Sequence, residues 1–462
     1  MIDGKFARGV LPALIFTLAI HGFTCAVSAA DSLDGWWQSD GYGLLLEIKG
    51  EQVNAFETTA ISCLPTATAK RQVETSDGAE AVLVMNEAPI KILVTAGTSA
   101  DHRFFGFIGA ASSIGFRRLA QPPATYGKQV ANDPLTNFDI FWTTFDEHYP
   151  FFALKEANWR RVRDQLRPKV TDATTREELF DIFKSMVEPL GDAHTFIAAG
   201  SQKLRFGGRR KDATHVDAAA RKRIQEIIET NYLHAKPKSW CNGRVGYGVI
   251  ADSIGYLRIT AFGGYTLNPD FDSQIKALEA SLDDLFNQAD NLTGLVVDVR
   301  INGGGSDLLG VTVANRLATN EYLAFRKKAR SDAADPTRFT EQQDTRVRPS
   351  DRPHFHGKVV LLTSGETISA GETFSMALMG RTPAVVRVGQ HTQGVFSDVL
   401  DRKLPNGFRF GLPNEIFLTE GNEAFDGPGI PPHVSVEVFS ANDLEAGRDT
   451  ALEKALELMR QE

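Results

Sequence analysis

The sequence predicts an α/β protein made of a small all-β domain, a three-helix bundle and an α/β core. Apolar and polar residues alternate between Gly and Asp turns in residues 31–122, a pattern typical of β-strands. The apolar period changes to 3.6 residues in 127–200, and strand patterns alternate with helix patterns in 246–440. A connecting segment at 201–245 and a C-terminal helix at 441–462 complete the predicted organisation.

The composition and the N-terminus predict an exported soluble protein. Of the 462 residues, 42% are hydrophobic and 23% charged, and the formal charge of −8 disfavours broad binding to nucleic acids or anionic membranes. Residues 1–30 combine a basic start, an apolar run too short to cross a bilayer comfortably, and small residues at Ala29-Ala30. We therefore expect a signal peptide cleaved near Ala29-Ala30 and a periplasmic or secreted product. A lipid anchor on Cys25 is the weaker alternative.

The first predicted domain, residues 31–122, could be a barrel or a sandwich, because both need the same alternation. Trp36 and Trp37 are expected in its core. Cys63 and Cys241 are the cysteines left after processing, and they either pair or remain buried free thiols.

Three stripes of apolar residues at helical spacing predict the bundle. The third helix is expected to begin with a capping box at Thr174 and Glu177 and to stop at Gly191. His194 follows immediately, so the sequence predicts a histidine at the rim of a rigid bundle. The connecting segment after it is polar and rich in arginine, which fits a solvated surface or, less readily, recognition of a substrate carboxylate.

The core contains two strand-to-helix junctions whose residues could take part in catalysis. Residues 295–300 form a predicted strand that runs into Asn302 and three glycines, 303–305, which allow close backbone approach without matching a nucleotide-binding fingerprint. Residues 358–379 read as strand, turn and helix, with Ser369 at the junction. A serine there suits a nucleophile beside the free N–H groups of the helix, but Ser369 and Glu372 also fit a simple capping box.

Six stretches together resemble the tail-specific, or C-terminal-processing, serine peptidase family. In chain order they are LGDAHTFI (190–197), GYLRITAF (255–262), GLVVDVRINGGG (294–305), TSGETISAGETF (363–374), VGQHTQG (388–394) and FDGPGIPPHVSV (425–436). The resemblance implies a ClpP/crotonase-like α/β core and a serine peptidase with Ser369 as nucleophile.

The resemblance also favours one branch of that family. The bacterial branch places a lysine after the T-x-G element, whereas Val395 follows Thr392-Gln393-Gly394 here. The tricorn-like branch uses a histidine ahead of the sheet, and His194 matches that position. The interval from His194 to Tyr256 is too short for a PDZ domain, so the sequence is similar to the PDZ-less, tricorn-core-like group.

By the same resemblance, His194 is the general base and Asp426 the acid that orients it. Glu423 is the fallback for the acid and Asp192 a further rival, while Asp426 could also be a plain turn residue.

The N–H groups of Gly303, Gly304 and Ala370 are the expected oxyanion hole, and Glu372 is expected to cap the helix. No metal or cofactor is expected, and nothing in the sequence resembles a metal cluster.

These residues predict an exported serine peptidase that forms an acyl-enzyme and acts on a peptide or protein substrate. A non-catalytic binding protein on the same fold, as in the retinoid-binding repeats, is the first alternative. An acyl-transfer enzyme of the crotonase type is the second, and the sequence shows no coenzyme A signature for it. The oligomeric state stays open.

Overall fold

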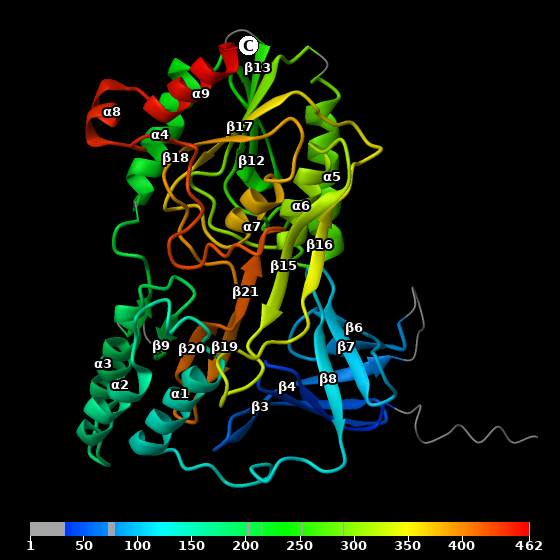
Figure 1. The fold of residues 1–462 in the computed structure, drawn as a ribbon, viewed down its shortest axis with the longest axis vertical. Helices are drawn as coiled ribbons and strands as arrows, with labels where there is room; N and C mark the ends of the chain where they lie inside the picture. The colour runs from blue at the N-terminus through cyan, green and yellow to red at the C-terminus, as the bar shows by residue number, and fades with distance from the viewer. Residues whose placement is uncertain are drawn as a thin grey trace, which may run out of the picture. The chain divides into compact units, whose positions relative to one another are not determined.

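Eight antiparallel strands near the N-terminus close into a barrel in the computed structural model (Figure 1). The strands are β1 (Gly35–Ser39), β2 (Leu44–Lys49), β3 (Gln52–Thr58), β4 (Cys63–Gln72), β5 (Ala81–Met85), β6 (Lys91–Ala96), β7 (His102–Phe107) and β8 (Ile114–Leu119). β8 pairs with β1, and this pairing decides for a barrel over a sandwich. Trp37 is fully buried inside it, as predicted for a core residue.

The structure describes residues 33–72, 79–200, 204–213, 215–250, 253–289 and 291–461, so the predicted signal peptide at 1–30 lies outside the described residues. Within those ranges, no helix has the length and apolar character needed to cross a membrane. Cys63 and Cys241 are both buried free thiols, which answers the pairing question against a disulfide.

The helices α1 (Pro134–His148), α2 (Trp159–Leu166) and α3 (Arg176–Val187) do not form a bundle with a core of its own. They share their core with an antiparallel sheet of order β10-β9-β20-β19. The ring centroids of Phe410 in this sheet and Phe141 in α1 are 4.8 Å apart. Its strands are β9 (Phe196–Ala198), β10 (Arg205–Gly207), β19 (Val399–Lys403) and β20 (Arg409–Pro413). The predicted bundle is therefore one wall of a larger core.

The capping box of α3 lies one residue later than predicted. Thr175, not Thr174, caps the helix, and its partner is Glu178 rather than Glu177. The hydroxyl of Thr174 instead accepts the N–H of Thr171 and closes the preceding turn. Gly191 adopts φ 55 after a 3-10 turn and ends this region, as predicted.

A seven-stranded sheet forms the α/β core, with the order β11-β12-β13-β14-β17-β18-β22. Its strands are β11 (Lys238–Trp240), β12 (Val245–Ile250), β13 (Ile254–Ile259), β14 (Gly294–Asp298), β17 (Lys358–Thr363), β18 (Val386–Gly389) and β22 (Val434–Ser435). The pairs from β13 onward are parallel. Their near-continuous apolar sequences fit a sheet that is buried on both faces.

Successive side chains of the central strands point to opposite faces, and each face has its own helices. Val297 and Leu361 pack with α5 (Phe271–Phe286), α6 (Asp307–Asn315) and α7 (Ala370–Ala377). Val296 and Val360 pack with α4 (Ala218–Asn231) and α9 (Thr450–Arg460), which lie on the other side in Figure 1. The result is a three-layer α/β arrangement.

The predicted C-terminal helix is divided into α8 (Ala441–Ala446) and α9, because Gly447 takes φ 68 and ends the first. A third sheet, of order β16-β15-β21, contains β15 (Tyr322–Ala329), β16 (Gln343–Val347) and β21 (Glu415–Leu418). This sheet joins the barrel to the core, since the hydroxyl of Tyr42 donates to Glu415 Oε1 at 2.6 Å.

Candidate active site

Ser369 lies in a strained turn between β17 and α7. Its backbone has φ 57 and ψ −120, a conformation that costs a non-glycine residue about 1–3 kcal/mol. The turn before it is held to the neighbouring strand end: Ser364 Oγ donates to the carbonyl of Arg300 at 2.6 Å and Thr367 Oγ1 to that of Val299 at 2.8 Å. The fold therefore fixes a half-buried serine hydroxyl at the end of the central sheet.

The carboxylate of Glu372 stabilises this turn through hydrogen bonds to backbone N–H groups. Its buried carboxylate accepts the N–H groups of Ser369, Gly394 and Val395 at 3.2, 2.7 and 2.9 Å. Burial raises the pKa of Glu372 to about 7, against the opposite effect of these hydrogen bonds. The bond to Ser369 is the predicted cap, whereas the bonds to residues 394 and 395 were not anticipated and tie a distant loop to the serine.

The glycine turn packs directly against Ser369. Asn302 organises it by accepting the Gly304 N–H at Oδ1 and donating to the Ile259 carbonyl, both at 2.9 Å. A Cβ added to Gly304, which has φ 87, would lie 2.8 Å from the Cβ of Ser369. Only glycine fits there, as expected for a backbone that approaches a reacting group closely.

The three predicted oxyanion donors are not equally available. The N–H of Gly303 donates to the Thr260 carbonyl at 3.1 Å, and that of Gly304 is bound by Asn302. Ala370 is the first residue of α7, where an N–H has no partner within the helix. The hydrogen bonds of the described residues include none from the Ala370 N–H, so it is the donor ready to receive an oxyanion.

Both the backbone and the ring of His194 are held by hydrogen bonds. Its N–H donates to Asp192 Oδ1 at 2.9 Å, and the hydroxyl of Tyr149 donates to Asp192 Oδ2 at 3.0 Å. The imidazole is buried, with 9% of the residue exposed, and burial lowers its pKa. Its Nδ1 has no hydrogen-bond partner among the described residues. Asp192 therefore holds the histidine's position in the chain but does not orient its ring.

Asp426 is also buried, with 3% exposed, and its Oδ2 likewise lacks a partner within the described parts of the chain. Burial and the nearby carboxyls of Glu372 and Asp192 raise its pKa well above the ordinary value. Glu423, the fallback acid, is exposed and lies near Arg387. The two candidates thus occupy very different environments, and only Asp426 lies beside Glu372.

One loop, residues 394–398, contacts all three predicted catalytic residues. The carbonyl of Val395 accepts the Ser369 N–H at 3.1 Å, the backbone of Phe396 hydrogen-bonds Asp426, and the backbone of Ser397 hydrogen-bonds the His194 ring. Among the described side chains, no hydrogen bond joins Ser369 to His194 or His194 to Asp426. The three residues therefore contact the same loop, but their side chains are not hydrogen-bonded to one another.

The same loop leads to a charged network around the buried Lys327 that the motifs did not reveal. Lys327 Nζ lies 2.7 Å from Asp398 Oδ2 and 3.0 Å from Glu415 Oε1, and Glu415 accepts the hydroxyl of Tyr42 from the barrel. The carboxylate of Asp398 favours the charged form of His194 and so opposes the effect of burial on its pKa. These four residues come from four distant segments, so no local pattern could have identified them.

Two arginines of the connecting segment also serve the site. Arg209 and Arg221 bind the buried carboxylate of Glu366 at 2.5 and 2.6 Å, three residues before Ser369. Both side chains remain partly exposed, as predicted for a solvated surface, and they also fasten the turn that carries the serine, which the sequence did not predict. Among the described residues, no three His, Cys, Asp or Glu side chains are grouped to hold a metal ion.

Comparison with known proteins confirms the resemblance. Residues 253–436 match the model of peptidase family S41, and residues 131–188 match the tricorn protease C1 domain. The first match contains Ser369, the glycine turn and Asp426, whereas His194 lies in neither. No curated protein matches the chain significantly.

Two solved structures show how far the fold is shared. The chain is similar to a putative peptidase from Parabacteroides merdae, with a TM-score of 0.61, 28% identity, and coverage of 72% of this chain and 98% of that one. It also resembles mature CPAF, with a TM-score of 0.52, 10% identity, and coverage of 72% and 97%. At 10% identity the second likeness shows the fold alone.

Proposed function

With residues 253–436 matching peptidase family S41 as the premise, we propose that this chain is a serine peptidase with Ser369 as its nucleophile. The observation that carries the proposal is the strained turn that places the Ser369 hydroxyl between the glycine turn and the N-terminus of α7. Strain of this kind persists only where the surrounding structure imposes it, and it is concentrated at reactive residues.

The proposed chemistry needs the His194 imidazole to come within hydrogen-bonding distance of the Ser369 hydroxyl. The lowered pKa of His194 keeps the imidazole neutral at pH 7, so it can take the proton of the Ser369 hydroxyl as the oxygen attacks the peptide carbonyl. The oxyanion is stabilised by the Ala370 N–H, the predicted donor that has no acceptor among the described residues. The imidazolium then protonates the leaving amine, and a water molecule, activated by the same histidine, hydrolyses the acyl-enzyme.

Asp426 is the proposed acid partner of the histidine. Burial raises its pKa and so disfavours the ionised carboxylate, whereas a positive charge on the imidazole would favour it. The two unsatisfied atoms, His194 Nδ1 and Asp426 Oδ2, are the natural pair to meet on closure. Each buried polar atom without a partner costs about 1–3 kcal/mol, so pairing them is favourable.

We place the protein in the tricorn-like branch and, from residues 1–30, in an exported location with peptides or proteins as substrates. The absence of a lysine at position 395 and the presence of His194 support the branch. The match of residues 131–188 to the tricorn C1 domain, which ends six residues before His194, agrees with it.

A non-catalytic binding protein on the same fold is the second candidate. The observation in its favour is the open Ser369–His194 chain, because a binding protein has no need to close it. A reactive serine separates the two candidates, since a binding protein would not activate its hydroxyl.

Labelling with a fluorophosphonate followed by peptide mapping tests both ideas together. We expect a covalent adduct on Ser369 in the wild type and none in Ser369→Ala. Ser375→Ala is the matched control, because Ser375 lies on the same helix and only donates to the Gly371 carbonyl. A folded wild type that remains unlabelled would favour the binding protein.

A further inference from the structure

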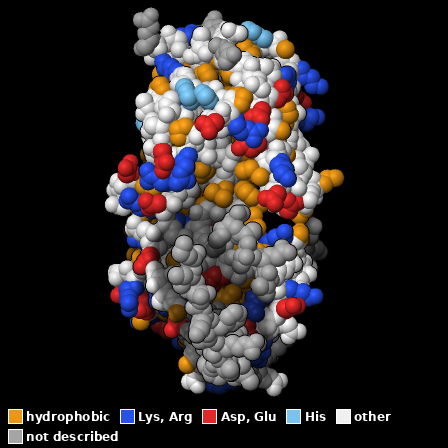
Figure 2. Space-filling model, turned by 90° about the vertical axis from the view of Figure 1, so that its right-hand side faces the viewer, with side chains coloured by type: hydrophobic (Ala, Val, Ile, Leu, Met, Phe, Trp, Pro, Cys, Tyr) orange, Lys and Arg blue, Asp and Glu red, His pale blue; other side chains and the backbone are white. Residues whose placement is uncertain are grey.

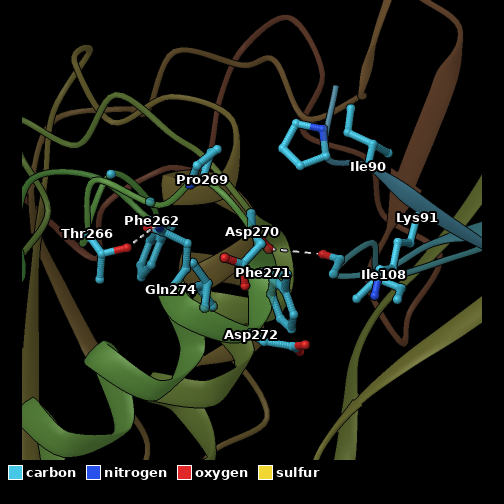
Figure 3. Close-up of a pocket in the computed structure, with 16 residues that line it drawn as sticks. Ile90, Lys91, Ile108, Phe262, Thr266, Pro269, Asp270, Phe271, Asp272 and Gln274 are labelled. Atoms are coloured by element: carbon cyan, nitrogen blue, oxygen red, sulfur yellow. Dashed lines mark hydrogen bonds between the residues drawn. The ribbon is translucent and has the colours of Figure 1, made fainter. Parts of the chain in front are cut away.

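A pocket of about 480 Å³ lies between the barrel and the α/β core. Figure 3 shows Ile90 and Ile108 of the barrel on one side and Phe271, at the start of α5, facing them from the other. Its volume is within the range of sites that bind small ligands or side chains. None of the predicted catalytic residues lines it, so the site described above does not account for it.

One wall of the pocket is formed by Phe262, which is bridged to the glycine turn at Gly305. Phe262, which lines the pocket, donates its N–H to the Gly304 carbonyl at 2.8 Å and accepts the N–H of Ser306 at 2.8 Å. Its ring packs on Phe374 of α7 at 5.2 Å. The pocket and the nucleophile thus share one piece of backbone, with Ser369 on the far side of Gly304.

The backbone between the pocket and Ser369 is open to solvent space. A Cβ added to Gly263, which lines the pocket, or to Gly303, beside Gly304, would meet nothing within 4 Å. Gly304 contacts both Ser369 and Phe262, so the separation is a few short contacts. An extended peptide advances about 3.3 Å per residue, and about two to four residues would therefore reach from the serine into the pocket. The glycines leave room for such a chain to pass close to the protein backbone.

The pocket is surrounded by exposed apolar side chains. Ile90 and Ile108, which line it, are 39% and 38% exposed, and Phe107 and Leu267, adjacent in sequence to lining residues, are 41% and 100% exposed. Figure 2 shows hydrophobic side chains gathered in a hollow across the middle of this face. Apolar side chains exposed together usually mark a binding surface.

The charges at the rim do not favour a charged ligand. Lys91 and Asp272 line the pocket with opposite signs, and the carboxylate of Asp270 is already used to cap α5 by accepting the Ser273 N–H at 2.8 Å. An apolar group is therefore the better match to the walls formed by Ile90, Ile108 and Phe271.

We propose that this pocket is a substrate subsite, which binds a large apolar side chain of the peptide about two to four residues from the cleaved bond. This inference rests on the proposed peptidase function and adds its substrate class: extended peptides with a bulky aliphatic or aromatic residue at that distance. It also gives the barrel a role, because Ile90 and Ile108 form one wall of the subsite.

The test compares peptides that differ only in having Leu or Ser at each position two to four residues from the cleaved bond. We expect the wild type to prefer Leu at one of them by about tenfold to a hundredfold in kcat/KM, as burial of such a side chain allows. Ile108→Asp and Ile90→Asp should abolish that preference. Ile61→Asp is the matched control, since Ile61 is an exposed barrel residue outside the pocket, and it should retain the preference.

The rate of fluorophosphonate labelling distinguishes a failure of the proposed subsite from a failure of the proposed peptidase function. The small probe needs no distal subsite, so labelling should proceed equally in all three variants and would also show that they are folded. If labelling is normal and Ile108→Asp and Ile90→Asp keep the full preference for Leu, the subsite is wrong and the peptidase stands. If the wild type neither labels nor cleaves any of the peptides, the function fails and the subsite with it.

Discussion

The two halves of the candidate active site differ in how completely they are built. On the nucleophile side, backbone N–H groups of Ser369, Gly304 and residues 394–395 all have acceptors, provided by Glu372, Asn302 and Val395. On the base side, His194 Nδ1 and Asp426 Oδ2 are buried without partners among the described residues. The backbone around Ser369, the proposed nucleophile, is held by hydrogen bonds. His194 and Asp426, the proposed base and acid, each keep one buried side-chain atom without a partner among the described residues.

This difference indicates which side chains must move when substrate binds, namely those of His194 and Asp426. Side chains can rotate at little cost compared with a strained turn, so a site in which only the histidine and aspartate must close keeps its reactive oxygen fixed. Catalytic hydrogen bonds are often long or unformed before substrate binds and tighten in the complex. The loop at 394–398 contacts both halves, so it is the segment through which closure would be transmitted.

The largest expected effect comes from removing the nucleophile. Ser369→Ala should lower peptide hydrolysis by about four to six decades, because without the hydroxyl no acyl-enzyme can form. The protein should stay folded, since the bonds from Ser364, Thr367 and Glu372 that hold this turn do not use the Ser369 hydroxyl. The measurement is kcat/KM on a peptide, with circular dichroism for the fold, and an unchanged rate would remove Ser369 from the mechanism.

Replacing His194, the proposed base, tests whether it activates Ser369. His194→Gln should slow fluorophosphonate labelling of Ser369 by about a thousandfold or more, because amide groups cannot accept the hydroxyl proton at pH 7. His215→Gln is the control, as His215 is mostly exposed and only contacts Glu366. Labelling at the full wild-type rate in His194→Gln would show that the two halves work independently.

The acid should have a smaller effect on rate and an opposite effect on stability. Asp426→Asn should slow turnover by about a hundredfold to a thousandfold, since the imidazolium loses its partner. Because the pKa of Asp426 is raised, the folded protein keeps a proton that the unfolded chain loses above about pH 4, so this residue lowers stability increasingly as pH rises. The variant should therefore have a higher Tm than the wild type, by a margin that grows as pH rises above about 4.

Glu423→Gln is the matched control for the acid, because Glu423 is exposed three residues earlier in the chain. It should change neither turnover nor the pH dependence of Tm. If Glu423→Gln instead slows turnover and Asp426→Asn does not, the acid must be reassigned to Glu423.

The fully formed half is also the half that local sequence patterns could predict. The strand, turn and helix around Ser369, the glycines after Asn302 and the cap at Glu372 each occupy a short stretch whose residue types determine its geometry. Even there the limits are visible at α3, where adjacent threonines both fit the capping pattern and only the three-dimensional turn selects Thr175.

The arrangement of His194 and Asp426 depends on contacts between segments that are distant in sequence. Val395 and its neighbours reach Ser369, Asp426 and His194 across gaps of 26 to about 200 residues, and no periodicity encodes such meetings. The same reason explains why the alternating strands could not decide between barrel and sandwich, since closure depends on the pairing of β1 with β8. Lys327 and Asp398 were likewise invisible, as isolated charges in ordinary strand and loop sequence.

The smallest expected effect probes the link between the charged network and the base. The carboxylate of Asp398 favours the charged form of His194, so Asp398→Asn should lower the pKa of the imidazole further below its ordinary value. Activity requires the neutral imidazole and is lost as pH falls through that pKa, so the acid limb of kcat/KM should move to lower pH, with less than about a tenfold change at pH 8. Asp401→Asn is the control, because Asp401 is an exposed residue on β19 that pairs with Arg409. A limb that stays in place in Asp398→Asn would show that the network does not act on His194, and a limb that moves to higher pH would show that another group is titrating.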